Sequence, residues 1–367
     1  MTATVRPPAE APAERELRDA WRAHGAAGGV LDELVAYSGR PFSHEDADGA
    51  HFPLEDEPFA AAWDGYVREA GECGAWPTLR DRLVQLRFPI AAGMSGRPEY
   101  LAATRRGIPP PAGPGLALNA PGELRLWMHP TPAGRIAVLR VPDRGDFESV
   151  VRALTARNEP RPVAASMGAC IVSGYNNWDR VAALRRTWEC AHPGAGEGEW
   201  RAELQSLAPR KELYQDRFIL LSDGYYSATP PEALGVEPAE WLRLSRVIRL
   251  EHECAHYVMR RVFGSMRSSL HDELLADHAG ITAAVGAFRG DWFLRFLGLE
   301  AHPRYRPGGR LENYRGTPPL SDAAFEILQA VVVRAAERLA AADPAPSGTA
   351  ALMSIACTSL PELARRG

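Results

Sequence analysis

The sequence lacks the features that mark several large classes of protein. Its 367 residues include only five cysteines, at positions 73, 170, 190, 254 and 357. An odd, widely spaced set of this kind does not make a disulfide framework, so we expect a reducing compartment, the cytoplasm. No run of 18 apolar residues is present, which predicts no membrane-spanning helix. The N-terminal residues also lack the apolar core of a secretory signal.

The sequence also lacks a large excess of charge of either sign. The formal net charge is −4, and no basic excess suggests nucleic acid as a partner. No repeat of 20–50 residues is apparent. With 46% hydrophobic and 24% charged residues, the composition fits one large or two ordinary globular domains. The sequence leaves the oligomeric state open.

The pattern along the chain predicts an α+β fold in three parts. We expect residues 1–14 to be a disordered Pro/Ala tail and residues 15–115 to form a mainly helical N-terminal region. A stretch rich in glycine and proline at 105–115 marks the boundary. Residues 116–367 would then form the second domain, with short strands expected at 123–128, 135–141, 162–173 and 217–222.

The most informative motif is His252-Glu253-x-x-His256. It lies in a helical pattern that begins at Pro238 and ends at Gly264. Each helical residue advances about 100°, so histidines four apart point within about 40° of each other and can reach one ion. Glu253 points roughly 60–100° away, within reach of a water on that ion without being a ligand. This spacing predicts a metal site with a general base.

A simpler interpretation treats both histidines as core residues. They share one stripe of the helix with apolar neighbours, and the stripe comprises Trp241, Ile248, His252, His256, Met259 and Phe263. Two unpaired imidazoles and a carboxylate would be costly to bury there, and a metal ion removes that cost. A structural zinc usually takes four ligands, mostly cysteine. Cys254 is the one cysteine nearby, and it faces about 200° away from His252.

A second helical pattern supplies the third ligand. It begins near Asp272, which we expect to be its N-cap, and ends between residues 286 and 290. Glu273 would complete a His, His, Glu site with a fourth position left for water. Asp277, one turn later on the same face, would accept the second ring N–H of a ligand histidine. His271, which precedes the helix, is the next choice, and His278 would point about 140° from Glu273.

H-E-x-x-H followed by E-x-x-x-D resembles the gluzincin group of zinc metallopeptidases, typified by thermolysin-like enzymes. The resemblance covers about residues 240–285. It implies that His252, His256 and Glu273 hold Zn²⁺, that Glu253 is the base and that Asp277 supports a ligand. It also implies a zincin-like core with a small sheet and a buried active-site helix within 116–367. In such folds a strand before this helix lines the cleft, which makes 218–222 the expected edge strand.

The rest of the chain matches no well-characterised peptidase. The third histidine of the metzincin pattern is missing, because Met259 and Val262 stand where glycine and histidine are required. The segments at 166–170, 176–179 and 216–224 resemble a bacterial family without an assigned activity.

Gluzincin chemistry also needs a donor for the developing oxyanion. Tyr305, Arg310 and Tyr314 are available beyond the third ligand, in a segment that could equally be a solvated loop.

These features predict a zinc-dependent hydrolase that acts on an amide or peptide bond of a restricted peptide or small-molecule substrate. Histidine and carboxylate ligands do not exclude another divalent ion. Two alternatives remain open at this stage. One is a metal-dependent tailoring enzyme in a small-molecule biosynthetic pathway, and the other is a non-catalytic binding protein stabilised by the metal.

Overall fold

The computed structural model describes residues 12–39, 42–43, 45, 50–110, 113–265, 269–342 and 348–365. The chain divides into two compact units. Unit 1 comprises Met1–Ala50 and Thr229–Gly367, and unit 2 comprises His51–Ala228. Unit 1 is therefore assembled from both ends of the chain, with unit 2 inserted between them.

Unit 2 contains a four-stranded mixed sheet in the order β1-β2-β4-β3. Its strands are β1 (Arg125–His129), β2 (Ile136–Val141), β3 (Ala169–Asn176) and β4 (Gln215–Ser222). β2 and β4 run parallel, whereas the β1–β2 and β3–β4 pairs are antiparallel. Together with the helices, this sheet confirms the expected α+β class. A strand overlaps each of the four predicted ones, although β3 begins at Ala169 and not at 162 as predicted.

The prediction that residues 218–222 form an edge strand is wrong. β4 pairs with β2 on one side and β3 on the other, so it lies inside the sheet. Phe218, Ile219, Leu220 and Leu221 are all buried. A continuous apolar run of this kind is typical of a strand covered on both faces, and that signal should have outweighed the analogy.

Three helices of unit 2 form one core with the sheet, namely α4 (Ala60–Cys73), α5 (Ala75–Arg82) and α7 (Arg144–Thr155). Unit 2 also contains α6 (Pro98–Arg106), α8 (Trp178–Ala191) and α9 (Glu197–Leu207). Trp63 of α4 lies against Phe218 of β4, with ring centroids 4.7 Å apart. Leu79 of α5, Phe147 of α7 and Leu139 of β2 belong to the same buried cluster.

This shared core explains why the two units differ from the predicted domains. The predicted boundary near residue 115 would separate α4 and α5 from the strands on which they pack. The 105–115 stretch does contain the glycine that ends α6, since Gly107 adopts a left-handed φ of 65°. The stretch rich in glycine and proline therefore marks the end of a helix here, not the end of a domain.

A buried polar network fixes the start of β4 to the start of α8. Asp216 is fully buried and forms an ion pair with Arg180. It also accepts hydrogen bonds from Asn177 Nδ2 at 2.6 Å and Trp63 Nε1 at 2.9 Å. Asn177 Oδ1 accepts hydrogen bonds from two backbone N–H groups, which makes Asn177 the N-cap of α8. Burial raises the pKa of Asp216, although the Arg180 charge opposes that rise.

Two consecutive helices of unit 1 carry the motifs found in the sequence. α10 (Pro238–Phe263) begins where Glu237 accepts hydrogen bonds from the first-turn N–H groups and ends at Gly264, with a φ of 67°. These bounds confirm the predicted helix. α11 (Leu270–Val285) begins earlier than predicted, because the Ser269 side chain accepts a hydrogen bond from the N–H of Asp272 and is the N-cap. The prediction of Asp272 as the cap was therefore wrong by one turn.

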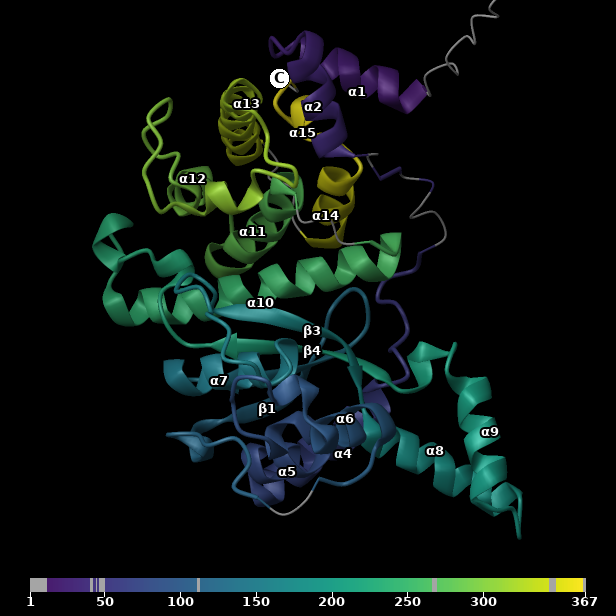
Figure 1. Ribbon diagram of the computed structural model, residues 1–367. Coiled ribbons are helices and arrows are strands. Elements are labelled where there is room, and N and C mark those ends of the chain that lie inside the picture. The colour runs from purple at the N-terminus through teal and green to yellow at the C-terminus, as the bar shows by residue number, and fades with distance from the viewer. Residues whose placement is uncertain are drawn as a thin grey trace, which may run out of the picture. The chain divides into compact units, whose positions relative to one another are not determined.

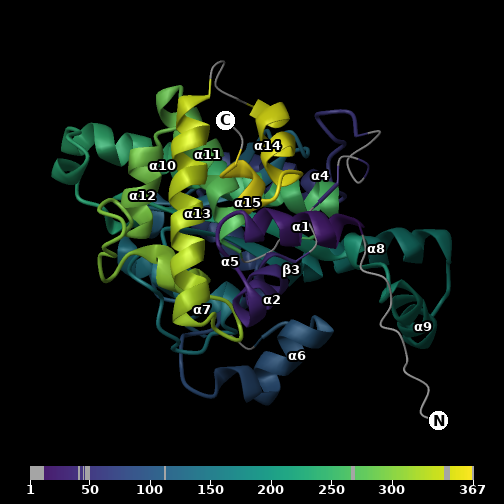
Figure 2. The same cartoon turned by 90° about the horizontal axis from the view of Figure 1, so that it is seen from above.

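The remaining helices of unit 1 come from both chain ends. They are α1 (Pro12–Arg22), α2 (Gly28–Ser38), α12 (Gly290–Leu297), α13 (Asp322–Ala341), α14 (Gly348–Ala356) and α15 (Leu360–Leu363). α1 and α2 lie beside α13 and α15 (Figures 1 and 2). His24 is hydrogen-bonded to the Pro361 carbonyl at 2.8 Å, and the Ser321 N–H donates to Glu33 at 2.8 Å. The first helices are thus an integral part of unit 1.

The tail predicted for residues 1–14 is too long, because α1 begins at Pro12. Leu17 and Trp21 are buried in unit 1, which accounts for an ordered helix so close to this end. Residues 1–11 lie outside the described part of the chain, so the prediction for them stays untested.

Two exclusions made from composition can be compared with the described residues. No helix among them combines the length and apolar character needed to cross a membrane. α10 has 26 residues and is long enough, but charged side chains such as Arg246 and Glu253 interrupt its apolar sequence. All five cysteines are free thiols, as their number and spacing predict.

Candidate metal centre

The predicted ligands lie where α10 and α11 pack closely together (Figure 1). His252 and His256 come from α10, and Glu273 comes from the first turn of α11. Gly280 permits the close approach, since a Cβ atom there would lie 2.5 Å from the carbonyl oxygen of Ile248. Any side chain at position 280 would therefore push the two helices apart.

The ligand atoms of the three residues converge. The Nε2 atoms of His252 and His256 are 3.1 Å apart. One Glu273 oxygen lies 3.7 Å from His252 Nε2, and the other lies 3.6 Å from His256 Nε2. All three side chains are buried, and their donor atoms form a group able to hold one metal ion.

These separations fit a tetrahedral zinc site. Ligands about 2.1 Å from one ion at tetrahedral angles lie about 3.4 Å from each other. The observed values of 3.1, 3.6 and 3.7 Å fall on both sides of that figure. Two imidazoles and one carboxylate are also a common donor set for a catalytic zinc, with a fourth position left open.

The electrostatics of the group favour a cation between the side chains. Burial opposes protonation of His256, yet the hydrogen bond to Glu273 and the Glu273 charge raise its pKa to about 9. Burial would raise the pKa of Glu273, but the hydrogen bond from His256 and the charges of His252 and His256 bring it below its usual value. The pocket thus draws positive charge to its centre, as a proton or as a metal ion.

Asp277 makes the contact with a predicted ligand histidine that its spacing led us to expect. It is fully buried, and its Oδ1 accepts a hydrogen bond from His252 Nδ1 at 2.8 Å. That bond leaves the Nε2 lone pair of His252 directed at the other ligands. The second Asp277 oxygen pairs with Arg310. Burial would raise the pKa of Asp277, but Arg310 and the hydrogen bond to His252 hold it below its usual value, so the carboxylate stays charged.

Tyr314 and Arg310 reach this site in supporting positions. The Tyr314 hydroxyl is hydrogen-bonded to the Glu273 carboxylate, and burial raises its pKa far above the usual value. Arg310 is directed at Asp277. Both residues were predicted as oxyanion donors, and the contacts observed here serve the ligands instead.

Tyr305, the third predicted donor, lies in a different environment. Its hydroxyl donates to the carbonyl of Gly309 at 2.7 Å, within its own loop. The neighbours that influence its pKa are Glu312, Arg306 and Glu300. These contacts give Tyr305 a part in shaping the 301–314 segment, and they do not bring it into the ligand group.

The alternative third ligands are engaged elsewhere. His271 Nε2 is hydrogen-bonded to the Ile355 carbonyl at 2.9 Å. His278 packs against the Phe288 ring, and burial lowers its pKa to about 4. Neither belongs to the converging group, which leaves Glu273 in the predicted position.

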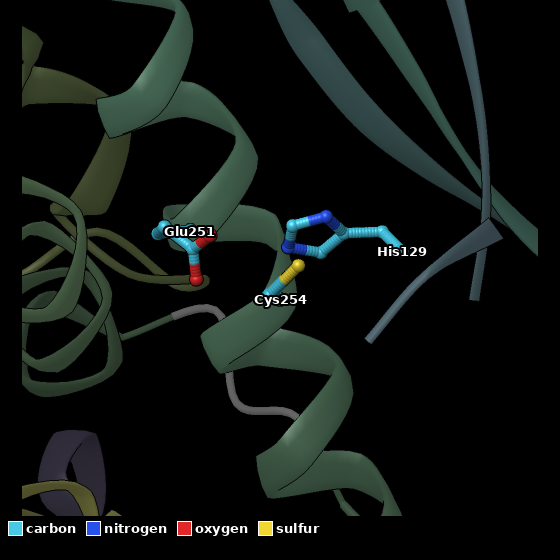
Figure 3. Close-up of side chains that lie close together, drawn as sticks. All are labelled: His129, Glu251 and Cys254. Carbon is cyan, nitrogen blue, oxygen red and sulfur yellow. The ribbon is translucent and has the colours of Figure 1, made fainter. Parts of the chain in front are cut away.

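Cys254 also stands outside this group, as its helical angle predicts. Figure 3 shows Cys254 and Glu251 projecting from α10. Cys254 is buried, and burial raises the pKa of its thiol well above the usual value. It is therefore held as a neutral thiol.

Glu253 adjoins the ligand group on α10. It is half-buried, and its negative charge helps to raise the pKa of His256. A carboxylate that is near the ligands and still partly exposed can exchange protons with a reacting molecule.

One residue of this site carries no signal in the sequence. Tyr37 of α2 accepts a hydrogen bond from the Leu270 N–H at 3.1 Å and donates one to the Tyr314 carbonyl at 2.8 Å. It therefore ties the start of α11 to the segment that contains Tyr314. Tyr37 lies more than 200 residues before its partners, so no local spacing could have indicated it.

Comparisons with known proteins identify a family without assigning an activity. The sequence pattern of a family of unknown function, DUF7005, matches residues 20–366, so the chain belongs to that family. No curated protein and no solved structure matches the chain.

Proposed function

We propose that this member of the DUF7005 family is a zinc-dependent hydrolase that cleaves an amide or peptide bond in a restricted substrate. The observation that carries the proposal is the convergence of His252, His256 and Glu273 at tetrahedral spacing beside Glu253. The zincin-like core belongs to the same proposal. A purely structural metal site would have no use for the adjacent carboxylate.

Glu253 is proposed as the general base. Its position next to His252 on α10 lets it take a proton from water at the site without occupying a ligand position. It would then deliver that proton to the leaving nitrogen as the bond breaks. A zinc ion, when bound, supplies a water of lowered pKa and a positive charge opposite the attacked carbonyl.

The residues around the proposed ligands orient the ligand side chains. Asp277 fixes the tautomer of His252, and Arg310 keeps the Asp277 carboxylate charged. Tyr314 orients the Glu273 carboxylate through its hydroxyl. The Tyr314 hydroxyl can donate to a substrate oxygen only if its contact with Glu273 breaks. We therefore assign Tyr314 the role of orienting the Glu273 carboxylate.

Replacement of Glu253 by glutamine tests the proposal. The Glu253→Gln variant should bind metal like the parent protein and lose nearly all turnover, since the amide cannot accept the proton. Elemental analysis measures the metal, and a library of peptides and small amides, assayed with and without a chelator, measures turnover. His256→Ala should lose both the metal and the turnover.

Glu240→Gln is the matched control, because Glu240 lies on the same helix, is exposed and paired with Arg243, and is in no group of possible metal ligands among the described residues. It should retain metal and activity. Full turnover in Glu253→Gln would show that another group is the base. A parent protein that binds no metal after purification and zinc addition would refute the proposal as a whole.

A further inference from the structure

Unit 2 contains a groove that the proposed hydrolase chemistry does not use. It has a volume of about 640 Å³ and lies between the end of α6 and the helices α8 and α9. That volume falls within the roughly 300–1,000 Å³ typical of ligand-binding sites. The groove is a candidate binding site in its own right.

The rim of the groove is basic although the chain as a whole is acidic. Arg105, Arg106, Arg185 and Arg201 line it, together with a single acidic residue, Glu197. Glu197 is already paired with Arg185 at 2.7 Å. Among the described residues, Arg105, Arg106 and Arg201 have no recorded ion-pair partner, and all three are exposed. The rim therefore presents unneutralised positive charge from two separate elements, the end of α6 and α9.

The floor of the groove is apolar. Ile108, Val181 and Leu204 line it, and Ile108 is 47% exposed, which is unusual for a large aliphatic side chain in this protein. An exposed aliphatic residue beside unpaired arginines favours an amphipathic anion as the ligand.

The limited accessibility of the two tryptophan rings that line the groove, Trp178 and Trp200, disfavours nucleic acid as the ligand. Gly107 covers Trp178 so closely that a Cβ atom at that glycine would lie 2.4 Å from the indole ring. Trp178 Nε1 also donates to the Thr104 carbonyl at 2.9 Å. Trp200 is buried, with the Arg185 guanidinium 5.8 Å from its ring centroid. Stacking of bases needs an open aromatic face, whereas Gly107 covers one face of the Trp178 ring and Trp200 is buried.

The separation of the arginines favours more than one negative charge on the ligand. One carboxylate is satisfied by one or two guanidinium groups, as in a bidentate pair. Here unpaired arginines lie both at the end of α6 and on α9. We propose that this groove binds an acidic peptide segment that carries an apolar side chain between its carboxylates. The site is independent of the metal centre and of the proposed hydrolysis.

Fluorescence anisotropy on the whole protein tests this inference. The probe is a labelled peptide in which one leucine is flanked on each side by two glutamates. Two control peptides replace all glutamates by glutamine or the leucine by alanine. The acidic leucine peptide should bind, both controls should bind more weakly, and added salt should weaken binding.

Protein variants locate the site. Combined Arg105→Glu and Arg201→Glu substitutions should weaken binding about tenfold or more, because both ends of the rim would then repel the peptide. Ile108→Ser should weaken it several-fold through the lost apolar contact. Arg186→Glu is the matched control, since Arg186 is exposed on α8 and does not line the groove. The substituted side chains are exposed, and circular dichroism checks that each variant is folded.

Three results would overturn the inference. The first is equal binding of the glutamine peptide, and the second is unchanged binding to the double variant. The third is tighter binding of an oligothymidylate or of dodecanoate at the same arginines, which would identify a different class of ligand.

Discussion

At the scale of single residues, Asp277 has a constrained position in the candidate metal centre. It is fully buried, and its two oxygens meet His252 and Arg310. The sequence predicts its contact with His252, because a spacing of four places Asp277 on the same helical face as Glu273. The partner Arg310 was expected to face the substrate, since spacing cannot show which of several nearby groups a long side chain selects.

Asp277→Asn should lower metal affinity by about 10–100-fold, because the amide can offer its N–H to His252 and misdirect the ring. Competition with a chelator of known affinity measures the change. Asp291→Asn removes a carboxylate that is paired with Arg289 on the surface of the same unit, and it should leave the affinity unchanged. Equal metal affinity in Asp277→Asn and the parent would mean that this carboxylate does not orient the ligand.

The hydroxyl group of Tyr37, far from the ligands in the sequence, also supports the candidate metal centre. Tyr37→Phe leaves the Leu270 N–H without its partner at the start of the helix that carries Glu273. We expect a loss of about 1–3 kcal/mol in stability of unit 1, together with weaker metal binding. Denaturant unfolding and chelator competition measure the two effects.

Tyr214→Phe is the control for this change, because the Tyr214 hydroxyl donates to Ala208 at an exposed position of unit 2. It should cost no more than about 0.5 kcal/mol. If Tyr37→Phe were equally mild and bound metal normally, the link from α2 to Tyr314 would have no energetic importance.

At the scale of helices and strands, local end signals are the most reliable part of the sequence. Pro238 and Gly264 mark α10 correctly. Errors arise where several capping residues compete, since Ser269 caps α11 in place of the predicted Asp272. The choice depends on which residue leaves the helical conformation, and tertiary contacts of the preceding loop decide that. Sheet order is a non-local property, which is why β4 was misplaced at an edge.

Gly280→Ala tests the packing of α10 on α11. The added Cβ atom would collide with the carbonyl of Ile248, so the helices must separate and carry Glu273 away from the histidines. Stability should fall by about 1–3 kcal/mol, and metal affinity should fall with it. Thermal unfolding with and without a chelator measures both.

Gly65→Ala, in the middle of α4, is the matched control. Its Cβ atom would meet nothing within 4 Å. This substitution should be neutral or should stabilise by about 0.5–1 kcal/mol, as alanine does in a helix. A Gly280→Ala protein that behaved in the same way would contradict the close approach of the two helices.

At the scale of the whole molecule, the fold class is readable from the sequence and the division into units is not. A helical region followed by short strands and further helices predicts α+β, as observed. The division depends on contacts between residues 12–38 and the C-terminal helices, and contacts between such distant segments leave no periodic pattern in the sequence.

Fragments test the division. A fragment of residues 51–228 contains the whole buried cluster of unit 2, so it should fold alone and melt cooperatively with or without a chelator. A fragment of residues 229–367 lacks α1 and α2 and should stay largely unfolded until residues 1–50 are supplied. Circular dichroism and amide exchange measure both. A stable 229–367 fragment would show that the N-terminal helices are dispensable.

The split construction of unit 1 also bears on how a ribosome produces this chain. α1 and α2 are translated before unit 2, and the helices on which they pack are translated after it. Unit 2 can fold in that interval, before α1 and α2 have the partners that bury Trp21 and Leu34. We expect these two side chains to stay exposed until the later helices emerge, and His252, His256 and Glu273 cannot converge before then.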